Sequence, residues 1–227
     1  MLGTIVNVIA IVIGSFIGIL LKKGIKEEFK DTIMNGIGLT VIIIGINSAI
    51  KSDNMVIVII SIVLGIFIGE NIRIEDRLNK LGNKMEKKFS KGDSNFSKGF
   101  VTASLVFCIG AMAIVGALES GLNANHQTLF AKSIIDGITS IIFASTLGIG
   151  VAFSAIPIFF YRGGISLLAQ LVKNIFTPSL ILEMSAVGGI LITAIGINIL
   201  GIKNIKVGNM LPGIFIPILY YVIINLL

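Results

Sequence analysis

Long apolar runs alternate with short polar segments along the whole chain, and this pattern predicts membrane-spanning helices. Most runs are roughly 16–20 residues long, which matches the hydrocarbon thickness that a helix has to cross. The run "VIVIISIVLGIFIG" at 56–69 does not alternate apolar and polar positions, as the strands of a membrane β-barrel would. We therefore expect an all-α, polytopic transmembrane helix bundle. Seven spans are predicted, at residues 3–21, 33–50, 55–69, 101–118, 130–161, 180–200 and 208–224.

The fifth run, 130–161, is unusually long for a single span. It would measure about 48 Å if it were wholly helical, at about 1.5 Å per residue. Within it, "TLGIGVAFSAIP" places two glycines shortly before Pro157. Glycine and proline can bend or break a helix, so we expect a distortion in this run.

Two polar segments between the runs carry apolar residues at helical spacing. The first is an amphipathic helix at 73–91 that lies in the headgroup region, with a partner-binding helix as the alternative. Its apolar positions are Ile74, Leu78, Leu81, Met85 and Phe89. The following "KGDSNFSKG" is typical of a flexible connector. The second is a shorter interfacial element with apolar residues at Ile165, Leu168, Leu171 or Val172, and Ile175, and a briefer echo at Ile25, Phe29 and Ile33.

Three sequence blocks recur in the same order in both halves and indicate an internal repeat. The matches are "GSFIGILLKKGI" (14–25) with "SAIPIFFYRGGI" (154–165), "IGIN" at 44–47 and 195–198, and "GIFIG" (65–69) with "GIFIP" (213–217). We expect two related three-helix units joined by one connecting span, a 3+1+3 arrangement. The predicted segments are a first repeat at 1–72, an amphipathic helix and linker at 73–99, a connecting span and external loop at 100–131, and a second repeat at 132–227.

The repeats run parallel or inverted according to the number of crossings between them. Positive loop charges do not decide, because the parallel arrangement puts Arg162 and Lys173 inside with Lys203 and Lys206 outside, and the inverted one exchanges them. The loop "ESGLNANHQT" has no Lys or Arg, and a simple crossing to an outside loop is the simplest assumption. We therefore favour parallel repeats and seven spans, with the amino terminus outside and the carboxyl terminus inside.

Composition supports a membrane protein and excludes several other classes. The 227 residues are 55% hydrophobic and 13% charged, and the mean hydropathy is +0.99. Soluble domains carry about 25% charged residues. The net charge of +6 is concentrated at 73–98, between two runs, which favours contact with anionic lipid on the cytoplasmic side and not nucleic-acid binding. The first run is followed, not preceded, by Lys22 and Lys23, so we expect a retained helix and not a cleaved signal.

The stretch "FCIGAMAIVGALESGL" (107–122), followed by "LFAKSIIDGITSIIFASTLGIGVAFSAIPI" (129–158), resembles the YdfK/YqgA-like family of bacterial membrane proteins, a domain of unknown function (DUF554). The resemblance covers nearly the whole chain, including the opening "GTIVNVIAIVIGSFIG". It implies a multi-pass protein of the bacterial inner (plasma) membrane and brings no substrate or activity. The residues that carry it are Cys108, Gly110, Ala111, Met112, Lys132, Asp136 and Gly137.

Polar side chains inside the apolar runs are the candidate functional residues, because they are costly in a membrane. Asp136 is the strongest, with Lys132 one turn before it. It forms either an ion pair that fixes helix rotation or a cation or proton site lining a cavity. Glu70 and Glu119 end their spans and are expected to be solvated boundary residues, and Glu119 is also a candidate residue for binding a substrate or ion. Glu183 falls near the start of its span, where the helix dipole favours a carboxylate.

Three asparagines are expected to be buried or nearly so: Asn7, Asn47 and Asn198. Asn47 and Asn198 correspond between the repeats. They either bridge helices through hydrogen bonds or coordinate a solute as a facing pair. The small-residue pairs Gly14–Gly18 and Gly65–Gly69 favour close helix contact, within the chain or between subunits of a homo-oligomer.

The sequence lacks the usual combinations of catalytic residues. His126 is the only histidine, Cys108 is the only cysteine, and Asp136 has no second aspartate within another run. We therefore expect no enzymatic activity, no cofactor and no metal. Two functions remain: a small-solute or ion transporter or channel with its site between the repeats, and a non-transporting membrane scaffold or regulatory protein that acts through the 73–91 helix.

Overall fold

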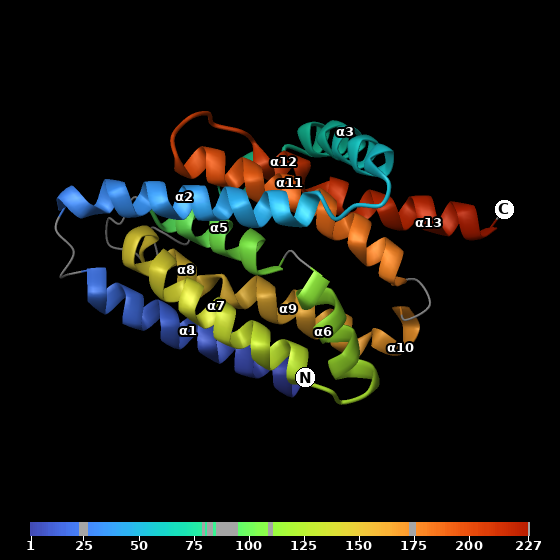
Figure 1. Ribbon diagram of the computed structural model, residues 1–227, viewed down its shortest axis with the longest axis horizontal. Coiled ribbons are helices and arrows are strands. Elements are labelled where there is room, and N and C mark those ends of the chain that lie inside the picture. The colour runs from blue at the N-terminus through green and yellow to red at the C-terminus, as the bar shows by residue number, and fades with distance from the viewer. Residues whose placement is uncertain are drawn as a thin grey trace. The chain divides into compact units, whose positions relative to one another are not determined.

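The computed structural model describes residues 1–22, 27–78, 80, 84, 95–108, 111–172 and 176–226, and within these ranges it is helical without a strand, as the sequence predicts (Figure 1). The helices are α1 Leu2–Lys22, α2 Glu27–Ala49, α3 Met55–Ile72, α5 Phe96–Cys108, α6 Ala111–Leu122, α7 Gln127–Leu147, α8 Gly150–Phe153, α9 Ala155–Leu167, α10 Ala169–Val172, α11 Pro178–Ile199, α12 Val207–Met210, the 3₁₀ helix η1 Leu211–Phe215 and α13 Ile216–Leu226.

The helices are long and apolar enough for a multi-pass membrane protein. Six candidate spans occur among the described residues, with α8 and α9 counted together as one of them. The pair α5 and α6 would make a seventh, although their axes differ by 61°. A shorter apolar stretch, Val207–Tyr221, runs through α12, η1 and α13.

The predicted distortion in the run at 130–161 is confirmed, but the prediction of a single span there was wrong, because the run consists of two spans. α7 ends at Leu147 and α8 begins at Gly150. Between them Gly148 has φ 75°, a left-handed conformation that ends a helix and is readily adopted by glycine. Pro157 lies in the first turn of α9, where proline is tolerated, so the glycine and not the proline divides the run.

The chain forms two compact units, each described here by itself. Unit 1 comprises Met1–Met34, Asn79–Cys108 and Met112–Leu171. Unit 2 comprises Asn35–Leu78, Ile109–Ala111 and Val172–Leu227. Each unit therefore combines helices from both predicted repeats. The division into four consecutive segments stays a prediction.

In unit 1, α1 packs along α7 and runs in the same direction (Figure 1). The contact depends on glycines: a Cβ on Gly14 would overlap the carbonyl of Gly137, and a Cβ on Gly18 would overlap the carbonyl of Ile141. Small residues let membrane helices approach closely and gain packing energy. The predicted role of the Gly14–Gly18 pair in close helix contact is confirmed.

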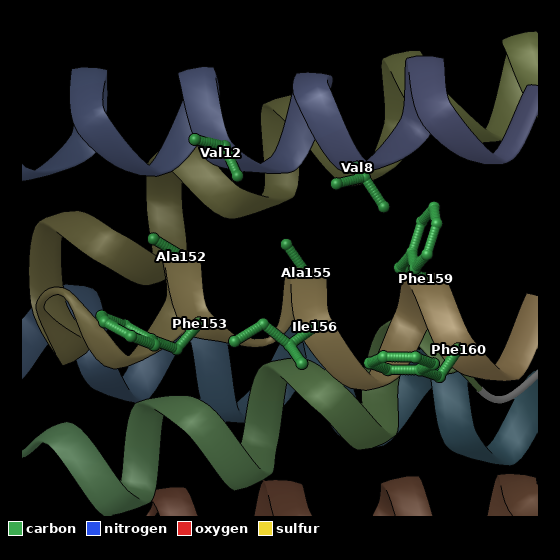
Figure 2. A pocket seen from close by; sticks show the side chains of 8 residues that line it. All are labelled: Val8, Val12, Ala152, Phe153, Ala155, Ile156, Phe159 and Phe160. Atoms are coloured by element: carbon green, nitrogen blue, oxygen red, sulfur yellow. The ribbon is translucent and has the colours of Figure 1, made fainter. Parts of the chain in front are cut away.

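α1 also lies against α8 and α9, which run in the opposite direction. The Met1 side chain is next to Gly163, Val8 points toward Phe159, and Val12 is beside Ala152 (Figure 2). An apolar pocket of about 430 Å³ lies along this contact. Its lining is Val8, Val12, Ala152, Phe153, Ala155, Ile156, Phe159 and Phe160.

In unit 2, α2 and α11 pack in opposite directions through glycines. A Cβ on Gly45 would lie 2.6 Å from the carbonyl oxygen of Gly189, while Gly38 meets Leu200 at the far end of α11. α3 packs in the same antiparallel way against α12 and η1, since Gly65 meets Gly213 and Gly69 meets Asn209. The predicted close contact at the Gly65–Gly69 pair is likewise confirmed.

These directions bear on the predicted repeat. The three matched sequence blocks fall on α1 with α9, on α2 with α11, and on α3 with η1 and α13, and each of these pairs runs antiparallel. The preference for parallel repeats was therefore wrong, because parallel repeats require corresponding helices to point the same way. The duplication itself stays a prediction.

Parts of the predicted interfacial elements lie outside the described residues. Residues 74–78 are helical, but Leu81, Met85 and Phe89 of the predicted 73–91 helix are not described. Ile25 and Ile175 also fall outside the described ranges. In the second element, Leu168 and Leu171 are exposed, as an interfacial face requires.

The glycine contact between α1 and α7 can be tested with one added methyl group. Gly14→Ala should lower the thermal unfolding midpoint in detergent, at a cost of about 1–3 kcal/mol, because the Cβ would overlap the backbone of α7. The matched control is Gly36→Ala in α2, where no atom lies within 4 Å of the added Cβ. Equal midpoints for the two variants would contradict the close contact.

Candidate functional site

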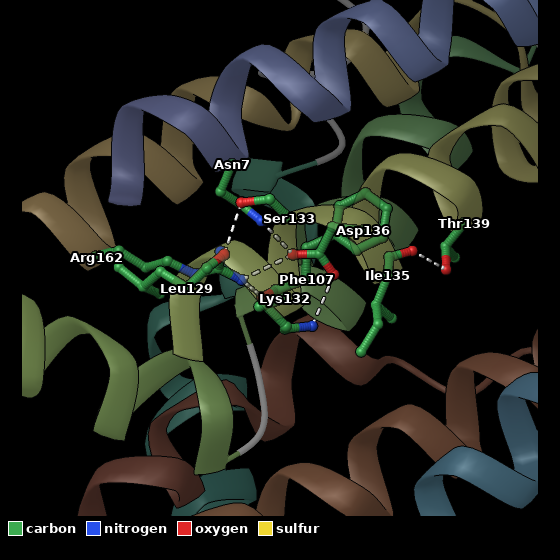
Figure 3. A network of polar contacts seen from close by, with 9 residues as sticks. All are labelled: Asn7, Phe107, Leu129, Lys132, Ser133, Ile135, Asp136, Thr139 and Arg162. Atoms are coloured by element: carbon green, nitrogen blue, oxygen red, sulfur yellow. Dashed lines mark hydrogen bonds and ion pairs between the residues drawn. The ribbon is translucent and has the colours of Figure 1, made fainter. Parts of the chain in front are cut away.

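The site is built around Asp136, near the middle of α7 in unit 1. Its side chain is 1% exposed. Oδ1 accepts a hydrogen bond from Lys132 Nζ at 2.7 Å. Oδ2 accepts from Asn7 Nδ2 at 3.0 Å and from Arg162 NH2 at 3.0 Å (Figure 3). Three donors from three positions therefore hold one carboxylate.

Arg162 brings α9 to the site. Its side chain is fully buried, and NH2 also donates to the backbone carbonyl of Phe107. Phe107 lies at the end of α5, where the last carbonyls have no partner further along the same helix. The arginine thus satisfies a carbonyl that the end of α5 leaves free.

Lys132 and Asn7 complete what we call the Asp136 cluster: Asn7, Lys132, Asp136 and Arg162. Lys132 lies on the same face of α7 as Asp136, four residues earlier, and its side chain is 11% exposed. Asn7, on α1, is fully buried. The predicted Asp136–Lys132 pair and the burial of Asn7 are confirmed. α1 and α9 belong to different predicted repeats, so the cluster joins residues from both.

Arg162 was missed by the sequence reading, which ended the fifth run at residue 161 and placed the arginine in a loop. Dividing the run at "LGIG" would have revealed a span at 150–167 with Arg162 inside it. An arginine inside an apolar span is the signal that could have found it.

The cluster has a surplus of positive charge and of hydrogen-bond donors. Two cationic side chains face one carboxylate. Within the part of the chain that the structure describes, Arg162 Nε and NH1 are buried without a hydrogen-bond partner, and so is the side-chain oxygen of Asn7. Buried polar groups are normally paired, because an unpaired one costs roughly 1–3 kcal/mol. The arrangement can accept a further ligand through these atoms.

The other two asparagines are in unit 2 and have different surroundings. Asn47 is exposed, so its expected burial was wrong. Asn198 is half-buried, and its amide bonds the backbone N–H and carbonyl of Ile205 at 2.7 and 2.8 Å, which closes the turn after α11. Because α2 and α11 are antiparallel, Asn47 and Asn198 lie at opposite ends of the helix pair. They do not form a facing pair.

Glu119 and Glu70 are boundary residues, as expected. Glu119 is half-buried at the end of α6 and accepts a hydrogen bond from Thr128 Oγ1 at 2.6 Å. Glu70 is 49% exposed and lies 3.5 Å from Lys206 Nζ. Neither belongs to the Asp136 cluster.

Glu183 has a different structural role from the expected one. It lies beyond the first turn of α11 and is 1% exposed. Its carboxylate accepts from Ser52 Oγ at 2.6 Å and from the backbone N–H groups of Asp53 and Asn54 at 3.0 and 3.1 Å. It therefore caps the turn that begins α3, instead of responding to the dipole of its own helix.

The fold and the Asp136 cluster define a class of protein: a polytopic α-helical membrane protein with a buried ionic cluster inside its spans. The family described as "Protein of unknown function (DUF554)" matches residues 2–222, and the chain belongs to this family. The uncharacterized membrane protein YdfK of Bacillus subtilis (strain 168) is 41% identical over 221 residues, which cover 96% of this chain and 94% of that protein. The uncharacterized protein YqgA of Escherichia coli (strain K12) is 31% identical over 220 residues, 95% of this chain and 94% of that protein. No solved structure matches.

The role of Glu183 leads to a prediction about stability. Glu183→Gln should lower the thermal unfolding midpoint, at a cost of about 1–3 kcal/mol, because an amide accepts more weakly and turns donors toward backbone N–H groups. Glu70→Gln removes an exposed carboxylate instead and should stay within about 0.5 kcal/mol of wild type. A Glu183→Gln midpoint as high as that of the control would show that the cap is unimportant.

Proposed function

We propose that this protein is a transporter or channel for a small solute or ion, and that its site is the Asp136 cluster. The observation that carries the proposal is Arg162, a fully buried arginine inside the span 150–167, with two nitrogen atoms that have no partner among the described residues. Ionisable groups inside membrane spans are costly and usually mark substrate or ion pathways.

A purely structural ion pair explains less of the cluster. Asp136 and Arg162 alone would form a neutral pair that joins α7 to α9. Lys132 adds a second cation, although Asp136 already accepts from Arg162 and Asn7. A static pair has no need for the extra charge or the unpartnered donors, whereas a binding site does.

The broken span α5–α6 also supports a binding site. Discontinuous helices near the middle of the membrane form the substrate and ion sites of many secondary transporters, because their ends free backbone groups for coordination. α5 ends at Cys108 next to the cluster, and α6 continues at an angle of 61° to it. The Phe107 carbonyl is such a freed group and is held by Arg162.

The directions of the helices favour eight crossings, with α5–α6 together as the fourth. Consecutive crossings alternate in direction, so the first and fifth, α1 and α7, should be parallel, and they are. The second and seventh, α2 and α11, should be antiparallel, as should the third and eighth, α3 and α12–α13, and they are. If α5–α6 did not cross, α1 and α7 would be antiparallel. Eight crossings make the two repeats inverted.

Positive charges agree with this topology. With eight crossings, fourteen of the eighteen Lys and Arg residues fall on one side of the membrane, which the positive-inside rule assigns to the cytoplasm. These are Lys22, Lys23, Lys26, Lys30, Arg73, Arg77, Lys80, Lys84, Lys87, Lys88, Lys91, Lys98, Lys203 and Lys206. Only Lys51 and Lys173 fall on the other side of the membrane. Lys132 and Arg162 lie within the membrane spans. The natural location is the bacterial plasma membrane, with both termini outside.

Inverted repeats fit alternating access, in which one repeat rocks against the other around a fixed site. The cluster takes Asn7 from the first predicted repeat and Arg162 from the second. Asp136, on α7 and also within the predicted second repeat, binds both. Relative movement of α1 and α9 would therefore act directly on the hydrogen bonds of the carboxylate.

The eight-span topology can be tested by single-cysteine labelling of intact cells in a Cys108→Ser background. Asn123→Cys, in the loop after α6, should react with an impermeant maleimide from outside. Asn204→Cys, in the loop after α11, should react only after the membrane is permeabilised. The seven-span parallel arrangement places residue 204 outside, so labelling of Asn204→Cys in intact cells would overturn the inverted topology.

The transport proposal predicts that Asp136→Asn abolishes flux. Purified protein in proteoliposomes would be assayed with chloride, formate, sodium and potassium gradients. Loss of the carboxylate releases Asn7, Lys132 and Arg162 from their common acceptor, so we expect flux to fall at least about tenfold, because intramembrane ionisable groups usually mark the transport pathway.

Two further variants serve as a second test of the cluster and as a control for the transport assay. Asn7→Ala removes one donor but keeps all charges, and should reduce flux with little loss of folding. Glu70→Gln changes an exposed carboxylate and should transport like wild type. Flux of wild-type rate in both Asp136→Asn and Asn7→Ala, or no flux of any tested ion in wild type, would contradict a transport site at the cluster.

A further inference from the structure

We propose that the Asp136 cluster binds a small anion that carries one negative charge. The inference names the substrate class of the proposed transporter and rests on that proposed function for its transport step. Binding itself is argued from the charges and hydrogen bonds of the cluster alone.

The charge balance of the cluster favours a counter-ion. Lys132 and Arg162 each form an ion pair with Asp136, so one positive charge is left over. The Arg162 and Asp136 side chains are 0% and 1% exposed, which leaves water little access. An uncompensated charge in such an interior costs several kcal/mol. One bound anion of unit charge makes the cluster neutral.

No other carboxylate of unit 1 supplies this charge within the described residues. Glu119, near the end of α6, accepts from Thr128 of α7, which lies one turn before Lys132. It forms no ion pair with Lys132 at 4.0 Å or less, whereas Asp136 does at 2.7 Å. The surplus therefore stays with the cluster.

The unpaired N–H donors of Arg162 favour a ligand that accepts hydrogen bonds. A guanidinium has five N–H groups, and NH2 uses its two on Asp136 and Phe107. The three N–H groups on Nε and NH1 have no partner among the residues that the structure describes. These donors suit a halide or a carboxylate oxygen and repel a bare cation. The free side-chain oxygen of Asn7 can accept a water or hydroxyl that accompanies the anion.

A cation site, the alternative suggested by the sequence, fits less well. Asp136 Oδ1 already accepts from Lys132, and Oδ2 already accepts from Asn7 and Arg162. A metal cation would have to displace one of these donors. It would also increase the net positive charge of the cluster. The carboxylate therefore positions the cationic groups, and the arginine receives the ligand.

The packing around Asn7 favours a small anion. On either side of Asn7, α1 contacts α7 closely, at Gly3 against Leu129 and at Gly14 against Gly137. These contacts fix the spacing of the two helices above and below the cluster. Chloride, nitrate and formate are the probes whose size and charge suit such a site.

Binding would be measured as the rise of the thermal unfolding midpoint when gluconate is replaced by chloride, nitrate or formate at constant ionic strength. A ligand that binds only the folded protein raises the midpoint in a saturable way. Wild type should show such a rise for at least one of the three anions. A response that is linear in concentration, or none, would overturn the inference.

Charge variants make the test specific. Lys132→Gln leaves the neutral Asp136–Arg162 pair, so it should fold and lose at least about tenfold in apparent anion affinity. Asp136→Asn raises the surplus to two charges and should increase that affinity about tenfold. Lys203→Gln removes an exposed lysine and should not change it. Wild-type affinity in Lys132→Gln would contradict the charge argument, even if Asp136→Asn fails to fold.

Flux measurements separate this inference from the proposed function. Saturable anion binding without flux of any tested ion would support the anion site and contradict transport. Sodium or potassium flux that needs Asp136, without any saturable anion response, would support transport and overturn the anion site. Chloride or formate flux that Lys132→Gln weakens would support both.

Discussion

The structure of unit 1 depends on one carboxylate, that of Asp136, which is buried inside a membrane span where a charge costs free energy. Asp136 receives hydrogen bonds from α1, α7 and α9, and Arg162 extends the same network to the end of α5. The shared acceptor gives these helices a fixed rotation, because a helix that turned away would leave a buried charge or amide unpaired.

Glycine contacts supply the second constraint. Membrane helices gain no hydrophobic energy from packing against one another, so association depends on close van der Waals contact and on polar contacts. Gly14 and Gly18 bring α1 onto α7, and Gly45 brings α2 onto α11. The first contact brings Asn7 within 3.0 Å of Asp136. Close packing and polar bonding are therefore parts of one arrangement.

The sequence predicted those features that follow from local spacing. Lys132 and Asp136 are four residues apart, so their pairing on one helix face could be derived. The spacing of the glycines likewise predicted close helix contacts. The relative direction of the matched sequence blocks could not be derived, because it depends on where a long apolar run divides. That division depends on the backbone conformation of Gly148. Because the sequence did not indicate it, Arg162 was assigned to a loop and not to a span.

Long-range partners were beyond the sequence pattern. Asn7 and Asp136 are 129 positions apart, and nothing in either run indicates that they meet. Matching Asn47 with Asn198 through a repeat said nothing about which face of its helix each occupies, and Asn47 is exposed. Burial of a polar residue in a membrane protein is decided by the neighbouring helices, which a single run does not reveal.

The short turn at Gly148 also has a consequence for biogenesis. α7 and α8–α9 form a hairpin, and Asp136 and Arg162 on its two arms are only 26 positions apart. A hairpin that enters the bilayer as one piece can carry Asp136 and Arg162 as an ion pair, which costs less than inserting the two charged spans one after the other. Insertion would thus set up the ionic core before the later spans emerge from the ribosome.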